Sequence, residues 1–478
     1  MVFSSLTFLG FFLPVALAAH WLAPRALRNA VLLLASLVFY TVGGGRMVLL
    51  LIVTSIIDYV AALVIDGGRA GTDVARRRAR FAVTASVVGN LAMLGYFKYA
   101  NFFVDQVNGA LTLAGSEALA WTPIALPIGI SFFTFQRMSY VIDVARGERE
   151  ATRDPIRFLL FVALFPQLIA GPIVRYADID DQLRRRDVRL EQLGVGGARF
   201  AHGLAKKVLV ADTVAVLADA VFALPADELT TTGAWIGAIA YSIQIYFDFS
   251  GYSDMAIGLG TMFGFDFPEN FARPYSAVSV TDFWRRWHVT LSTWFRDYVY
   301  IPLGGSRDGA ATYRNLWIVF ALTGLWHGAA WTFIVWGLYH GLLLVLERRF
   351  DLRAFEASGA TALARRTVTL VLVIVGWVFF RADGMGQAVD VVTAMFTPAG
   401  AALPASVAAL LDNRTALVLV ASCTVALLPG DLVVGRWITE AGEATRPRLR
   451  LAFVTLVLPL AMVVAASSTF SPFLYFRF

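Results

Sequence analysis

The stretch MVLLLIVTSIIDYVAALVI at residues 47–65 decides the fold class of this chain. It contains one acidic residue, no basic residue and no proline, and its length suits a helix that crosses a bilayer. Similar apolar runs occupy residues 30–40 and 451–466. These runs are continuous, without the alternation of barrel strands, and lipid requires each backbone polar group to find an internal partner. The pattern therefore predicts an all-α, polytopic membrane protein built as a helical bundle.

Composition agrees with that prediction. Of the 478 residues, 58% are hydrophobic and 15% are charged, whereas about a quarter are charged in an ordinary soluble protein. The formal charge of +6 comes from Lys and Arg in short clusters between apolar runs, as in loops that face anionic lipid and cytoplasm. We therefore expect a lipid bilayer and no nucleic acid as partner. The single cysteine, Cys423, excludes an internal disulfide and any CxxC motif.

The positive-inside rule supplies an orientation. The densest basic cluster, Arg69–Arg80, is expected in the cytoplasm, and counting back from it places the N-terminus outside. Counting forward predicts one membrane domain over residues 1–478, about eleven to thirteen membrane elements, and an extracytoplasmic tail at Thr469–Phe478. No Lys or Arg precedes the apolar run Phe3–Trp21, so we interpret this run as a retained first helix.

Three regions differ from plain spans. Residues 158–174 are interrupted by Pro166 and Gly171-Pro172, which predicts a kinked or re-entrant element. Residues 264–314 are polar but rich in aromatics, which predicts amphipathic or half-inserted helices near the cytoplasmic face. Residues 315–346 are too long for one span of about 20 residues and too short for two. They predict a helical hairpin that enters the membrane and returns.

His327 is the leading candidate for catalysis, in the stretch LTGLWHGAAW at residues 322–331. It falls near the predicted turn of the hairpin, where an ionisable group is costly and therefore a functional candidate. A neutral imidazole can take the proton of a hydroxyl while that oxygen attacks an acyl carbonyl. Gly324 and Gly328 would let another backbone or a substrate approach closely. The alternative is a structural histidine, hydrogen-bonded between helices.

His288 is the second candidate, in the stretch FWRRWHVTLSTWFRDY at residues 283–298. The adjacent Arg285 and Arg286 would hold a phosphate-bearing donor such as a coenzyme A arm. The alternative is an interfacial belt of Trp and Arg. The remaining histidines have no metal-ligand spacing, so no metal site is expected; they are His20, His202 and His340.

Asp248 and Asp254 are carboxylates within the apolar residues 241–255, and each needs a partner. These two carboxylates would line a tunnel, pair with the arginines of residues 271–286, or carry ions. A structural salt bridge is the plainer interpretation. Ion carriage would suit a second functional class, an ion-coupled transporter, but the inverted repeats typical of transporters are not visible. Signatures of several soluble enzyme classes are also missing from the sequence, among them GxSxG, HExxH and the P-loop.

Several motifs in order along the chain resemble the membrane-bound O-acyltransferase (MBOAT) family, and look closest to membrane subunits of bacterial alginate O-acetylation. Besides the two histidine stretches, they are MVFSS (1–5), LPIGISF (126–132), YVID (140–143), FPQLIAGP (165–172) and DFSGYSDMAIG (248–258). The resemblance implies a bundle with a central funnel and a tunnel between the two membrane faces. It also implies His327 as the catalytic position and His288 as its companion. Candidates for donor binding or for the tunnel wall are Trp326, Arg285, Arg286, Asp248 and Asp254.

The resemblance further implies a co-substrate, an acceptor and a location. The co-substrate would be acetyl-CoA or another cytoplasmic acyl thioester, with no bound cofactor, and the location would be the bacterial inner membrane. The final acceptor would be an exported polysaccharide, with alginate, cellulose and peptidoglycan left open. A related system transfers D-alanine to teichoic acids through a short aromatic C-terminal peptide, and Tyr475 matches the tyrosine of such a peptide. We hypothesise that Tyr475 relays the acetyl group to an extracytoplasmic SGNH-type acyltransferase.

Overall fold

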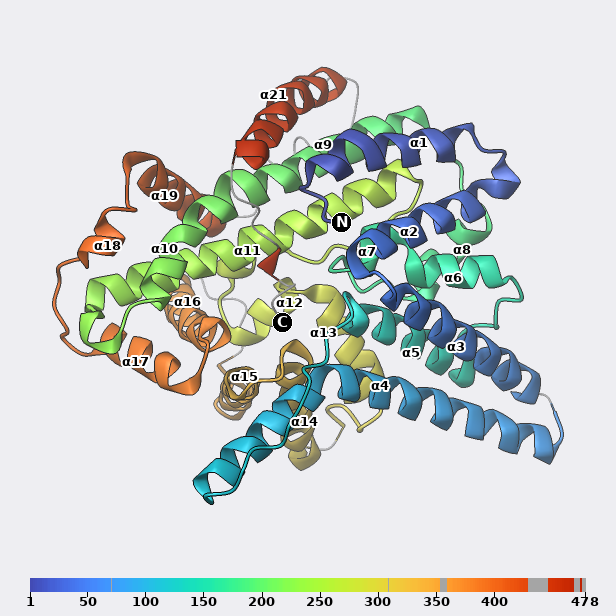
Figure 1. Cartoon of the computed structure of the whole chain (residues 1–478), viewed down its shortest axis with the longest axis horizontal. Helices are drawn as coiled ribbons and strands as arrows, with labels where there is room; N and C mark the ends of the chain where they lie inside the picture. The colour runs from blue at the N-terminus through green and yellow to red at the C-terminus, as the bar shows by residue number, and fades with distance from the viewer. Residues whose placement is uncertain (70, 308, 353–358, 429–445, 468–472, 475–478) are drawn as a thin grey trace. The chain divides into compact units, whose positions relative to one another are not determined.

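The computed structural model describes the chain except residues 70, 308, 353–358, 429–445, 468–472 and 475–478 (Figure 1). Its regular structure is helical, and no strand occurs among the described residues, which confirms the all-α fold class. These residues form two compact units. The first comprises Met1–Gly197 with Ala256–Pro268, and the second comprises Ala198–Met255 with Glu269–Phe478.

Five helices in the described part of the chain are long and apolar enough to cross a membrane. They are Arg25–Gly44, α3 (Met47–Arg69), α4 (Asp73–Leu113), α16 (Gly359–Arg381) and Arg450–Ser467. Most of their side chains are not buried inside the protein, as expected of helices whose apolar surface faces lipid. The chain is therefore an integral membrane protein. The count of eleven to thirteen membrane elements, the single domain, the central tunnel and the positions of the termini stay predictions.

The first unit contains helices from the N-terminal half. Besides α3, α4 and the first part of α9 (Leu190–Ala205), its helices are η1 (Phe8–Phe12), α1 (Leu13–Leu22), η2 (Arg25–Leu27), α2 (Arg28–Gly44), α5 (Ile130–Arg146), α6 (Pro155–Ala163), α7 (Phe165–Leu168) and α8 (Tyr176–Arg184). The interruption predicted within residues 158–174 is confirmed, because α6 ends at Ala163 and the short α7 ends before Gly171. Pro166 falls in the first turn of α7, where its missing N–H costs nothing.

A buried polar cluster joins three helices of the first unit. The Asp58 carboxylate on α3 accepts hydrogen bonds from Ser86 Oγ (2.6 Å) and Asn90 Nδ2 (2.9 Å) on α4. Arg137 Nε on α5 lies 3.5 Å from the same carboxylate. A buried carboxylate needs such partners, so this cluster ties α3, α4 and α5 together. The sequence analysis did not single it out.

The second unit contains the last part of α9, most of α11 (Thr231–Met262) and the C-terminal helices. Besides α16 and α21 (Arg446–Ser467), these include η3 (Lys206–Ala211), α10 (Asp212–Phe222), η4 (Ala226–Glu228), η5 (Pro274–Ser276), α12 (Val280–Arg286), α13 (Val289–Phe295), η6 (Arg296–Tyr300), α14 (Gly309–His327), α15 (Trp331–Arg349), α17 (Met385–Phe396), α18 (Ala405–Ala408) and α19 (Asn413–Leu427). The helices predicted in residues 264–314 are confirmed, and they are the short elements η5, α12, α13 and η6. Their position near the cytoplasmic face stays a prediction.

The predicted hairpin is confirmed as α14 and α15, which are joined by residues 328–330 (Figure 1). A side chain at Gly324 would overlap the carbonyl oxygen of Phe333, and one at Gly337 would overlap the carbonyl oxygen of Phe320. The two helix backbones therefore meet at small residues, as in many membrane helix pairs. A close approach of another backbone or of a substrate was expected at Gly324. In the structure the backbone of α15 makes that approach. His327 is the last residue of α14, at the turn.

Candidate active site

His327 lies in an aromatic cage. Its side chain is buried, and its ring centroid lies 4.9 Å from that of Trp326, 4.9 Å from that of Trp336 on α15 and 5.1 Å from that of Phe380 on α16. Three helices thus fix one imidazole at the hairpin turn. Loss of any of these rings would leave a cavity beside it.

His288 lies between α12 and α13 and is also fully buried. Its backbone φ of 44° lies in the left-handed region, which is uncommon for a residue other than glycine and is often found at functional sites. Its Nδ1 lies 3.0 Å from Oδ1 of Asn270. Because that oxygen only accepts, Nδ1 carries the proton, and Nε2 of a neutral ring remains an acceptor. Burial lowers the pKa of His288, which favours that neutral ring at pH 7.

Asn270 is a functional candidate that the sequence analysis missed. Its Oδ1 also accepts hydrogen bonds from Thr290 Oγ1 (2.9 Å) and Thr290 N (3.3 Å), and its carbonyl accepts from Val289 N (3.0 Å). One buried asparagine therefore holds both the His288 ring and the first turn of α13. No local pattern around Asn270 marks it, because the contact is between segments 18 residues apart.

The Trp326 ring lies close to both candidate histidines. Its ring centroid is 5.9 Å from that of His288 and 4.9 Å from that of His327. The structure thus brings three predicted residues together within the second unit. His340, which was expected to be ordinary, accepts a hydrogen bond at its Nδ1 from Trp284 Nε1 (3.3 Å), as a structural histidine between helices does.

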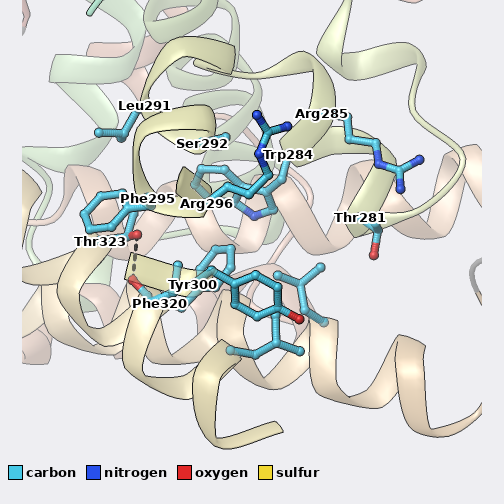
Figure 2. Close-up of a pocket in the computed structure, with 13 residues that line it drawn as sticks. Thr281, Trp284, Arg285, Leu291, Ser292, Phe295, Arg296, Tyr300, Phe320 and Thr323 are labelled. Carbon is cyan, nitrogen blue, oxygen red and sulfur yellow. Dashed lines mark hydrogen bonds between the residues drawn. The ribbon is translucent and has the colours of Figure 1, made fainter. Parts of the chain in front are cut away.

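An apolar pocket of about 230 Å³ is lined by residues of α12, α13, η6, α14 and α15, and neither candidate histidine is part of its lining (Figure 2). Figure 2 shows Arg285 and Arg296 on one side of it, across from Tyr300 and Phe320. Thr323 in its wall lies four residues before His327 on α14, on the same helix face. The complete lining is Thr281, Trp284, Arg285, Leu291, Ser292, Phe295, Arg296, Tyr300, Leu316, Val319, Phe320, Thr323 and Leu344.

The two predicted donor-binding arginines have different positions. Arg285 lines the pocket, whereas Arg286 pairs with Asp282 at 2.8 Å and is not part of the lining. The N-terminus of α12, which carries both, is held by Glu347 of α15. That carboxylate accepts the backbone N–H groups of Val280 (2.5 Å) and Thr281 (2.9 Å), and a carboxylate at a helix N-terminus is stabilising.

Asp254 on α11 is part of a structural ion-pair network. It pairs with Arg199 (3.0 Å) and Lys206 (2.6 Å), and Arg199 also pairs with Glu269 (2.6 Å). These contacts therefore agree with the plainer interpretation of Asp254, a structural salt bridge. The alternative pairing with the arginines of residues 271–286 is wrong, because the cations come from α9 and η3.

Asp248 pairs with Lys207 (2.9 Å), and both side chains are buried. Lys207 also pairs with Asp212 (2.6 Å). The second carboxylate oxygen of Asp248 accepts the backbone N–H of Leu474 at 2.8 Å. Asp248 thus holds the C-terminal segment, a contact that the sequence analysis did not predict. For Asp248, too, a partner among the arginines of residues 271–286 is wrong.

Phe473 and Leu474, the two described residues of the C-terminal tail, lie close to His288. The Phe473 ring stacks on Tyr252 with centroids 4.4 Å apart and lies 6.0 Å from Phe249. The Phe249 ring in turn lies 4.8 Å from His288. The Phe249 ring therefore lies close to both Phe473 and a candidate imidazole. Tyr475 itself lies outside the described residues.

Comparison with known proteins adds a family and its relatives. Residues 122–380 match the membrane-bound O-acyltransferase family, and this segment contains His288, Trp326 and His327. The chain is 43% identical, over the full length of both proteins, to a probable alginate O-acetylase AlgI of Azotobacter vinelandii. It is 49% identical to the protein of the same name in Pseudomonas aeruginosa, over 83% of this chain and 75% of that protein. A peptidoglycan O-acetyltransferase of Helicobacter pylori is 35% identical, over 83% of this chain and 80% of its own.

Proposed function

The chain belongs to the membrane-bound O-acyltransferase family, and we propose that it passes an acetyl group from a cytoplasmic thioester across the inner membrane to acetylate an exported polysaccharide. Full-length similarity to proteins named alginate O-acetylase supports alginate as the polymer. The observation that carries the chemistry is the pair of buried imidazoles, His288 and His327, which both lie close to the Trp326 ring. An extracytoplasmic acyltransferase of the SGNH type completes the transfer.

His327 acts as the general base in this proposal. Its imidazole takes the proton of the attacking hydroxyl, whose oxygen bonds to the acetyl carbon while the carbon–sulfur bond breaks. The imidazolium then returns the proton to the leaving sulfur, which gives a free thiol. His288 assists, with its proton fixed on Nδ1 by Asn270 and its Nε2 left to accept a hydrogen bond.

The pocket shown in Figure 2 suits the donor. Its apolar lining fits the arm of an acyl thioester such as acetyl-CoA, and the guanidiniums of Arg285 and Arg296 fit phosphate oxygens. Thr323 leads from the pocket toward His327 along one face of α14. The donor would thus present its thioester at the hairpin turn.

Tyr475 serves as an acyl relay in the same proposal. Its phenol oxygen is the hydroxyl that attacks the thioester, which forms an acetyl-tyrosine and releases the thiol. The acetyl group then moves to the extracytoplasmic acyltransferase, and the phenol is restored. The contacts of Phe473 with Tyr252 and of Leu474 with Asp248 support the relay, because they hold the preceding residues beside His288.

The transfer is tested in alginate-producing cells that lack their own membrane acetylase. We expect the present chain to restore O-acetyl groups on the polymer, and His327→Ala to abolish them. His20→Leu is the matched control, because it removes a buried imidazole from the first unit. Normal acetylation with His327→Ala would contradict the proposal. Acetylation of peptidoglycan in place of alginate would favour the activity named for the Helicobacter pylori relative.

The relay has its own test. Mass spectrometry of the C-terminal peptide is expected to show an added acetyl group on Tyr475 after exposure to acetyl-CoA, and none in Tyr475→Phe. Tyr475→Phe is also expected to abolish polymer acetylation. Wild-type acetylation with Tyr475→Phe would end the relay idea while leaving the family activity in place.

A further inference from the structure

The first unit contains a small basic pocket of about 120 Å³. Five arginines line it against one carboxylate, Asp187, and they come from two segments, the start of α2 with the turn before it and the end of α8 with the loop after it. They are Arg25, Arg28, Arg184, Arg185 and Arg186. Such an excess of positive charge in one pocket calls for an anion.

Three of the arginines already have partners. Arg184 makes two hydrogen bonds of 3.0 Å to the Asp180 carboxylate, and Arg25 lies 3.5 Å from Asp187. Arg186 donates to Asn29 Oδ1 (2.6 Å) and to the Phe263 carbonyl (3.0 Å). These contacts fix the walls of the pocket.

The other two arginines have donors to spare. Arg28 makes one long hydrogen bond, 3.4 Å from its Nε to the Ala23 carbonyl. The Arg185 side chain makes no hydrogen bond and no ion pair in the part of the chain that the structure describes. Two guanidiniums that share a pocket match the several oxygens of a phosphate group.

The position of the pocket points to a membrane source for that phosphate. Arg25 begins the candidate span Arg25–Gly44, so the pocket lies at the end of a membrane helix. The neighbouring Leu22 and Leu27 are 86% and 54% exposed, and they offer apolar surface to acyl chains. By the positive-inside rule this end faces the cytoplasm, where anionic lipids are recognised by such basic pockets.

We propose that this pocket binds a phosphate group, and that the group belongs to the head of an anionic phospholipid. Arg28 and Arg185 hold the phosphate oxygens, and Leu22 and Leu27 contact the chains of the lipid. The bound phosphate joins the start of α2 to the loop after α8, where Asn29 Nδ2 already donates to the Leu183 carbonyl at 2.9 Å. The proposal does not depend on the acetyl transfer.

Native mass spectrometry of the full chain in detergent tests the lipid, with phosphatidylglycerol as probe and phosphatidylcholine as the zwitterionic comparison. We expect Arg28→Gln/Arg185→Gln to bind phosphatidylglycerol about thirtyfold more weakly than the wild type, since each arginine contributes about 1 kcal/mol. The matched control is Arg149→Gln/Arg153→Gln. Both of these arginines are exposed, belong to the same unit and lie in a loop expected on the same side.

A second arm distinguishes the sources of phosphate. Line broadening in phosphorus NMR reports binding of inorganic phosphate to the same variants. If Arg28→Gln/Arg185→Gln loses inorganic phosphate binding but binds the lipid as the wild type does, the pocket is a phosphate site. The assignment of that phosphate to a phospholipid would then be wrong. Equal binding of both probes by the two double variants would overturn the site itself. If the double variant does not fold, the single variant Arg185→Gln takes its place in both measurements, because the Arg185 side chain is exposed.

Discussion

Two sets of polar side chains lie in the interior of the second unit, the first buried or half-buried and the second buried, and they accommodate burial in different ways. Between η3 and α11, the carboxylates of Asp248 and Asp254 are each matched by cations, Lys207 for the first and Lys206 with Arg199 for the second. The imidazoles of His327, at the hairpin turn, and of His288, between α12 and α13, are surrounded by aromatic rings.

The difference follows from charge. An ionised carboxylate cannot be buried without a partner, so each aspartate is committed to structure or to holding the tail. A neutral imidazole carries no such demand and keeps an atom that can accept a proton. The aromatic layer around His288 and His327 is therefore suited to chemistry, and the ion-pair network is suited to holding helices and the backbone of Leu474 in place.

The largest expected effect is on stability, from Lys207→Met. This change leaves the buried Asp248 without its cation, which typically costs about 3–5 kcal/mol. A thermal unfolding experiment on the purified protein measures it. The double variant Lys207→Met/Asp248→Leu is expected to recover most of that stability, because the fully buried carboxylate is removed together with its cation, and Asp212, the other partner of Lys207, is only partly buried. If the double variant is as unstable as Lys207→Met, the Lys207–Asp248 pair would contribute to stability by more than neutralising a buried charge.

The second effect concerns the aromatic layer. Asn270→Ala removes the acceptor that fixes the His288 ring, and loss of such a supporting hydrogen bond typically lowers activity about 10–100-fold. We expect kcat to fall while KM stays near its wild-type value. Asn315→Ala is the control, because Asn315 is equally buried but donates to the carbonyls of Leu303 and Gly305. An equal fall in kcat for both variants would assign Asn270 to general packing.

The smallest effect separates two adjacent arginines. Arg285→Gln is expected to raise KM for the thioester about fivefold, because one charge–phosphate contact contributes about 1 kcal/mol near a surface. Arg286→Gln should leave KM unchanged, since its partner is Asp282. Kinetics with acetyl-CoA measure both. A larger rise for Arg286→Gln would place the donor elsewhere than the pocket in Figure 2.

Much of the fold follows from the sequence, because lipid imposes one strong rule on the backbone. Long apolar runs located α2, α3 and α21, and the length of residues 315–346 predicted the hairpin. The position of His327 at its turn followed from the same argument. The expected kink near Pro166 is also confirmed, because proline and glycine act locally.

Contacts between distant segments could not be predicted in the same way. Lys206 and Lys207 meet the α11 carboxylates because α9 and α11 approach closely at Gly203 and Gly251, where an added side chain would overlap the opposite backbone. The amino-acid composition does not show which residues of α9 and α11 lie opposite each other. Nor does any local pattern pair Asn270 with His288, and the hydrogen bond between Leu474 and Asp248 spans 226 residues.

The central claim is that the imidazole of His327 carries the proton in acyl transfer. The most direct measurement is consumption of acetyl-CoA by the purified chain, with wild type and His327→Ala compared with and without added imidazole. We expect turnover to fall about 1,000-fold in the variant, as for loss of a general base, and to recover in part when imidazole fills the vacated site. Unchanged turnover in His327→Ala would remove this residue from the mechanism.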